Sequence, residues 1–169
     1  MLGAMISPSN GEVYFEDGLG IAAYCEVGEL LERSTSQVDG GGSRSLPGLP
    51  GYSQHLLGIH RADHGEFECE VTTGADGRVC AVFLSHVHAF YRPDADGERD
   101  RRTFHMSVLQ RDLKGQVEFS WGTVGCRADR RMHRDWLVVA YSRGVSVPLS
   151  RREDLRELLA SETEPDDSA

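Results

Sequence analysis

The chain has 169 residues, of which 39% are hydrophobic, enough for one domain that buries about two thirds of its unfolded surface. No apolar run approaches the roughly 18 residues that a membrane helix needs. The N-terminal sequence MLGAMISP lacks the basic and apolar regions of a signal peptide. A net charge of −9 argues against general nucleic-acid binding, which depends on neutralising phosphates. We therefore expect a cytoplasmic protein with neither a membrane nor a nucleic acid as its partner.

The charge is unevenly distributed along the chain. Residues 1–91 carry −8, residues 92–134 carry +3, and residues 135–169 carry −4. An acidic balance of this kind suits a basic protein partner, since complementary charge accelerates encounter.

The first third of the chain predicts little regular structure. Residues 11–18 form a short strand that ends in an Asp-Gly turn. Three apolar residues at spacing i, i+3, i+4 predict a short helix over residues 26–34. Residues 34–53 are rich in Gly, Ser and Pro, and we expect them to form a flexible loop within the domain.

The pattern then becomes that of antiparallel strands. Residues 55–61 are a candidate strand, and residues 65–73 alternate between apolar and acidic side chains. An Asp-Gly turn leads to a long returning strand over residues 78–91. A polar loop at residues 93–97 follows.

The last part of the chain alternates between helix and strand. A broad apolar face predicts a helix over residues 99–114, and a glycine directly after it ends the helix. Residues 116–124, 135–141 and 145–147 are predicted strands. A capping box at residues 150–153 opens a closing helix, whose apolar stripe is Leu155, Leu158 and Leu159.

This order of elements predicts an α+β fold. We expect a curved antiparallel sheet of about six to seven strands with two or three helices packed on one side. The single domain covers residues 1–161, and residues 162–169 form an acidic, disordered tail. The four cysteines form no CxxC pair, so we expect reduced, structural thiols at Cys25, Cys69, Cys80 and Cys126.

Three carboxylates along one strand face form the most informative feature. Glu66, Glu68 and Glu70 alternate with apolar residues, so they share the face that does not enter the core. Neighbouring like charges repel by a few tenths of a kcal/mol, and this face must therefore contact solvent. Such a stripe serves either solubility and edge protection or docking of a basic protein.

Two histidines raise the alternative of a metal site. His86 and His88 lie two residues apart on one predicted strand and therefore share a face. His60, His64 or Asp63 would be the further ligands. No motif completes this set, so the sequence predicts no cofactor, and a small metal-dependent enzyme remains only an alternative function.

Other catalytic and binding patterns are weak. No GxSxG motif occurs, and the run Gly40-Gly-Gly-Ser43 does not follow the pattern of a phosphate-binding loop. The sequence therefore predicts a protein that is not an enzyme. The connection between the last two long strands is basic, and its charged residues are Arg127, Arg130, Arg131, His133 and Arg134. We interpret it as a solvent-exposed connection that balances nearby acidic residues.

Several features follow one another in a characteristic order over residues 11–142. An opening strand leads through Leu19-Gly20-Ile21 to a short helix, a strand hairpin at residues 66–91 and a helix that ends near Gly115. A Trp121-Gly122 strand and a later strand ending in Tyr141 come next. This order resembles the immunity proteins that neutralise bacterial polymorphic toxins. The glycine-rich loop at residues 40–51 and the C-terminal helix depart from that pattern.

The resemblance implies a protein that binds a cognate toxin stoichiometrically and performs no chemistry. The acidic stripe would then cover a basic surface of the toxin. Aromatic anchors would complete the interface, with Tyr52, Phe90 and Tyr91 as candidates. A scaffold that self-associates through a sheet edge is a further alternative, and the sequence leaves the oligomeric state open.

Overall fold

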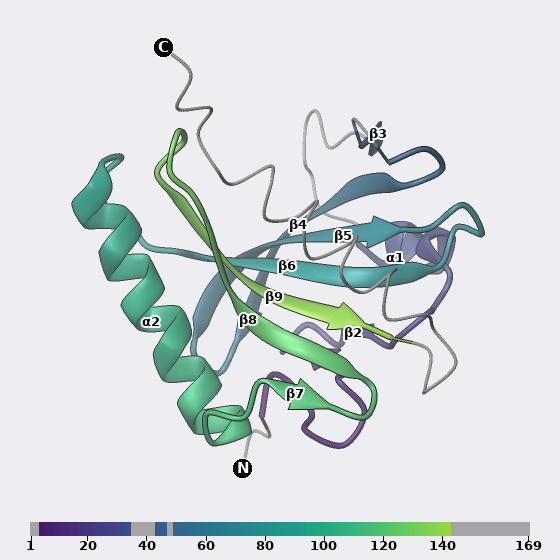
Figure 1. The fold of residues 1–169 in the computed structure, drawn as a ribbon, viewed down its shortest axis with the longest axis horizontal. Helices are drawn as coiled ribbons and strands as arrows, with labels where there is room; N and C mark the ends of the chain where they lie inside the picture. The colour runs from purple at the N-terminus through teal and green to yellow at the C-terminus, as the bar shows by residue number, and fades with distance from the viewer. Residues whose placement is uncertain (1–3, 35–42, 47–48, 143–169) are drawn as a thin grey trace.

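The fold, seen in a computed structural model that describes residues 4–34, 43–46 and 49–142, is α+β, as predicted. An open seven-stranded antiparallel sheet is accompanied by a separate pair of short strands and two helices (Figure 1). In chain order the elements are β1 (Val13–Tyr14), β2 (Gly20–Ile21), α1 (Val27–Arg33), β3 (Ser43–Ser45), β4 (Ser53–Ala62), β5 (Gly65–Thr73), β6 (Val79–Val87), α2 (Ala95–Leu113), β7 (Glu118–Phe119), β8 (Gly122–Asp129) and β9 (Arg134–Tyr141).

The strand order of the large sheet is β3-β4-β5-β6-β9-β8-β7. Strands β3 to β6 are neighbours in the sheet in the same order as in the chain and form an antiparallel meander. Short turns join β4 to β5 and β5 to β6. After β6 the chain passes through α2 and returns at the far edge as β7 and β8. Strand β9 then fills the space between β8 and β6.

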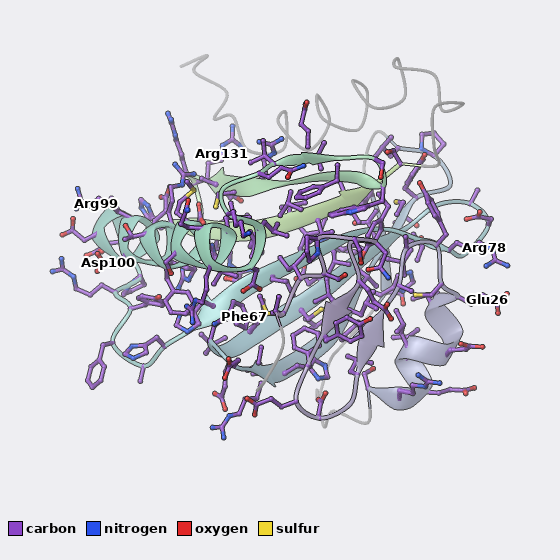
Figure 2. The ribbon with its side chains drawn as sticks, turned by 90° about the horizontal axis from the view of Figure 1, so that it is seen from below. Glu26, Phe67, Arg78, Arg99, Asp100 and Arg131 are labelled. Atoms are coloured by element: carbon purple, nitrogen blue, oxygen red, sulfur yellow. The ribbon has the colours of Figure 1, made fainter. Side chains whose placement is uncertain are left out.

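One face of the sheet carries the main core. Phe67, Cys69 and Val71 of β5 are completely buried on this face, and Figure 2 shows Phe67 in the interior. Leu30 of α1, Val108 of α2 and the strands β1 and β2 contribute to the same apolar cluster. The helices thus cover one side of the sheet, as the order of the elements predicted.

The helix ends follow the local sequence. Helix α1 matches its prediction within a residue, and α2 ends where Lys114 and Gly115 adopt positive φ angles of 54° and 76°. Helix α2 begins earlier than predicted, so the expected loop at residues 93–97 is partly helical. The Asp94 side chain accepts the N–H groups of Asp96 and Gly97 and thereby caps the helix.

Two strand predictions were wrong in their extent. Strand β6 ends at Val87, because the chain turns back through a hydrogen bond from the Tyr91 N–H to the His88 carbonyl. The predicted strand over residues 116–124 is the hairpin of β7 and β8. At Gly122, whose φ is 157°, a Cβ would lie only 2.0 Å from the Ala140 carbonyl oxygen.

The residues that carry the family resemblance meet in the core. The Trp121 ring lies against Gly11, and the Tyr141 hydroxyl donates to the Gly11 carbonyl at 2.8 Å. The Trp121 and Tyr141 ring centroids are 6.1 Å apart. These contacts join the start of the chain to the turn between β7 and β8 and to β9.

Within the predicted flexible loop at residues 34–53, Ser43–Ser45 forms β3 and pairs with β4. The remainder of that prediction lies mostly outside the described residues. The predicted strand at residues 145–147, the closing helix and the acidic tail lie wholly outside them.

Candidate functional site: the outer face of the sheet

The sheet face opposite the core, here called the outer face, carries the predicted acidic stripe. In the register of β5 and β6, Glu66, Glu68 and Glu70 lie opposite Val87, Ser85 and Phe83. Directly opposed residues of antiparallel strands point to the same side. On β6 this face is therefore open at Val87 and Ser85, whereas Phe83 is buried in a second, small apolar cluster.

The three glutamates differ in their partners. Glu66 faces Arg61 of β4 in an exposed ion pair of 3.5 Å. Glu70 accepts a hydrogen bond from the amide of Gln54, which in turn accepts from Arg44. Glu68 has no hydrogen bond or ion pair with another described residue. The stripe thus has an ion pair at Glu66 and a hydrogen bond at Glu70, and its middle carboxylate has neither among the described residues.

The Glu70 carboxyl reflects the repulsion expected of the stripe. Its pKa is raised above the ordinary value, first by burial and then by the negative charge of Glu68. Arg44, Arg134 and the Gln54 amide act in the opposite direction without cancelling it. Glu70 is therefore the structural member of the stripe, whereas Glu66 and Glu68 are more available to a partner.

Exposed apolar side chains flank these two carboxylates. Ile59 of β4 lies opposite Glu68 and is 54% exposed, and Val87 of β6 lies opposite Glu66 and is 38% exposed. We call Ile59, Glu66, Glu68 and Val87 the outer patch. A surface that alternates apolar and charged side chains is suited to contact with another protein.

The loop that follows Val87 presents an aromatic ring beside this end of the sheet. Phe90 is 85% exposed, the highest value among the large apolar residues that the structure describes. The Phe90 N–H donates to His88, whose ring lies 5.2 Å from the Phe90 ring. Phe90 thus projects from a backbone that is fixed by its neighbours.

Tyr91 anchors this loop to the body of the protein. Its hydroxyl is 2.7 Å from His86 Nδ1, and the Arg101 guanidinium lies 4.8 Å from its ring centroid. Arg101 also donates to the His86 carbonyl at 3.2 Å. Of the two predicted anchors in this loop, Phe90 is free to contact a partner, and Tyr91 supports the loop.

Tyr52 is separated from these two residues. Tyr52 directly precedes β4. The start of β4 lies beside the end of β5, and the end of β5 lies beside the start of β6, so Tyr52 is at the end of the sheet where β6 begins. Phe90 and Tyr91 follow the opposite end of β6. At about 3.3 Å per strand residue, Tyr52 and Phe90 lie at opposite ends of the sheet.

The histidines considered as metal ligands are already engaged. The His86 ring stacks on Phe104 at 3.6 Å, and burial, followed by the charges of His105, His88 and Arg101, lowers its pKa to about 4. His60 bonds to Asp17 and to the Leu57 carbonyl, while His64 bonds to Asp112. His60 and His64 therefore bind different partners from those of His86 and His88, and the four rings do not share a set of contacts.

Among residues 4–34, 43–46 and 49–142, one group of three side chains has the spacing of a metal site: His105, Cys126 and Asp135. His105 bonds to Asp135 at 2.6 Å and accepts the His86 N–H at 3.0 Å, so both ring nitrogens are occupied. Burial raises the pKa of the Cys126 thiol to about 12, which disfavours the thiolate that a metal requires. The group is a structural network, which Arg102 completes through Asp135.

Sequence reasoning missed this buried network. His105 lies four residues before Leu109 on the apolar face of α2, and this spacing was the available signal. Asp135 opens the apolar run of β9, 30 residues further along the chain. Only the packing of α2 on β9 brings the two together.

Comparison with known proteins gives one solved structure. It is titled "Rhs1-CT in complex with cognate immunity protein RhsI1", and the match covers 93% of this chain and 97% of the other at 12% identity. The TM-score is 0.48. No family model matches the chain, and no curated protein matches it.

Within the described residues, no helix is both long enough and apolar enough to cross a membrane.

Proposed function

We propose that this protein is a cytoplasmic immunity protein that binds a cognate bacterial toxin stoichiometrically and neutralises it without chemistry. The observation that carries the proposal is the outer patch, in which exposed Ile59 and Val87 flank the carboxylates of Glu66 and Glu68. The sequence resemblance supplies the class of partner.

The chemistry of the outer patch suits a basic protein surface. Ile59 and Val87 lose exposed apolar area when a partner covers them, which favours binding. Glu68, which has no counter-charge among the described residues, gains one from a lysine or arginine of the partner. Phe90, fixed beside the patch, provides an aromatic anchor of the kind that dominates many interfaces.

The first experiment tests for the complex itself. The protein is co-expressed with the toxin candidate encoded by the neighbouring gene, one partner carries a tag, and both co-purification and growth are measured. We expect a stable complex of fixed stoichiometry and restored growth. Neither co-purification nor rescue would contradict the proposed function.

A charge reversal then tests the interface. In the double variant Glu66→Lys/Glu68→Lys we expect association to slow by about tenfold or more at low salt, because attraction to a basic partner becomes repulsion. The difference should shrink as salt screens the charges. Association rates are measured by stopped-flow or surface plasmon resonance at several salt concentrations.

The matched control is Glu29→Lys/Glu32→Lys on exposed positions of α1. This variant makes the same change in net charge away from the outer patch. Equal slowing in both double variants would mean that net charge alone matters, and the outer patch would not be the interface.

A further inference from the structure

A pocket of about 320 Å³ lies between the first turns of α2 and the tip of the β8–β9 hairpin. Its lining consists of Ala95, Glu98, Arg99, Arg102, Arg130 and His133. Both views place these elements together: the hairpin tip approaches the start of α2 in Figure 1, and Arg99 and Arg131 lie toward one end of the molecule in Figure 2. The proposed toxin interface does not use this pocket.

The three arginines of the pocket differ in how they are held. Arg102 donates to the fully buried Asp135 at 2.8 Å, and Arg99 pairs with Asp96. Arg130 has no hydrogen bond or ion pair with any described residue. Arg102 is therefore held in the wall of the pocket by a buried carboxylate, Arg99 is engaged in an exposed ion pair, and Arg130 is available to a ligand.

His133 occupies a backbone conformation that is costly for a side chain. Its φ of 50° lies in the left-handed region, which non-glycine residues adopt rarely and which recurs at functional sites. Arg101 donates to the His133 carbonyl at 3.5 Å. The turn thus directs the His133 ring toward α2, where it lines the pocket.

The His133 ring offers an unused polar atom. Its Nδ1 is buried and has no hydrogen-bond partner, although Glu98 Oε2 lies 3.4 Å away in an orientation unsuited to a hydrogen bond. The pocket therefore combines donors from Arg130 and His133 with one acceptor, the Glu98 carboxylate. The N-terminal amides of α2 are not among the donors, because Asp94 already binds those of Asp96 and Gly97.

We propose that this pocket binds phosphate. Arginine presents paired donors that match the oxygens of an oxyanion. The Glu98 carboxylate would repel an anion that lacks a proton, but it can accept a hydrogen bond from a P–OH group. Inorganic phosphate retains such a group at neutral pH, whereas sulfate does not.

Isothermal titration of the intact protein with inorganic phosphate tests the inference, with sulfate compared at equal ionic strength. We expect saturable binding of phosphate and none of sulfate. Arg130→Ala should weaken phosphate binding by about tenfold or more, as expected for the loss of a charged hydrogen bond. The matched control Arg131→Ala, an exposed arginine of the same hairpin tip outside the pocket lining, should bind as the unmodified protein does.

A second variant tests the role of Glu98. Glu98→Gln replaces the carboxylate with an amide that can donate to an unprotonated oxyanion, so we expect sulfate binding to appear. Glycerol 2-phosphate is titrated in parallel with inorganic phosphate. Tighter binding of glycerol 2-phosphate would indicate that the pocket takes a phosphate ester, and tighter binding of inorganic phosphate would indicate that it takes the free ion.

The inference is overturned if phosphate does not bind saturably, if sulfate binds equally well, or if Arg130→Ala and Arg131→Ala behave alike. None of these measurements involves the toxin. Failure of the phosphate site is therefore distinguishable from failure of the proposed immunity function.

Discussion

Folding buries the His86 imidazole and changes its protonation behaviour. The strand pattern predicts that its imidazole shares a face with His88, and the rings are indeed stacked with centroids 6.1 Å apart. Contact with Phe104 and the hydroxyl of Tyr91 buries the ring and favours its neutral form.

The lowered pKa of His86 makes a prediction about stability. Between pH 6.5, the ordinary histidine value, and pH 4, the unfolded chain binds a proton at His86 that the folded protein does not bind. The free energy of unfolding should therefore fall as pH falls through this window. We expect His86→Phe to reduce this dependence, measured by urea unfolding at a series of pH values.

Tyr91→Phe provides the control for this experiment. It removes the same hydrogen bond, which is worth about 1 kcal/mol, but leaves the His86 imidazole in place. If both variants lost stability with the same slope between pH 6.5 and pH 4, His86 would not be the titrating group.

Helix α2 begins at the capping residue Asp94, which the spacing of apolar residues does not indicate. The apolar spacing that predicts a helix starts only at Phe104, whereas the helix itself begins at Ala95. The intervening residues are mostly charged, and Asp96 forms ion pairs with Arg92, which precedes the helix, and with Arg99. The start of α2 is thus fixed by capping at Asp94 and not by burial.

Removal of this cap should destabilise the protein. Asp94→Ala leaves the N–H groups of Asp96 and Gly97 without their acceptor, so we expect a loss of about 1 kcal/mol in the free energy of unfolding. Asp100→Ala makes the same chemical change at an exposed position within α2 and should have little effect, since alanine favours helix. Equal urea midpoints for the two variants would contradict the role of Asp94 as the cap.

The whole molecule presents Phe90 at the end of the sheet that carries the outer patch. We expect Phe90→Ala to weaken the toxin complex by a factor of ten or more, mostly through faster dissociation, because a buried aromatic anchor is lost. The free energy of unfolding should not change, since the Phe90 ring is 85% exposed. Binding kinetics and urea unfolding of the same variant separate the two effects.

Met132→Ala serves as the control for Phe90. Met132 is also strongly exposed, at 64%, but belongs to the β8–β9 turn and is not a member of the outer patch. An equal loss of affinity in both variants would show that the Phe90 loop is not part of a defined interface.

The sequence by itself determined the local elements and the side of the sheet that each residue faces. Alternation in β5 separates Phe67, Cys69 and Val71 from the glutamates, because strand side chains repeat every two residues. The spacing of Leu30 and its neighbours likewise determined α1. Both patterns act over a few residues and need no knowledge of distant segments.

Only the tertiary structure decided which surfaces meet. The insertion of β9 between β6 and β8, the pairing of His105 with Asp135, and the pocket between Glu98 and His133 all join segments about 30 residues apart or more. At the ends of the acidic stripe, strand pairing also decides the partners: Arg61 reaches Glu66, and Gln54 reaches Glu70, from β4. The reason is physical: local periodicity fixes the direction of a side chain, but its neighbours depend on strand register and packing, which the whole chain sets together.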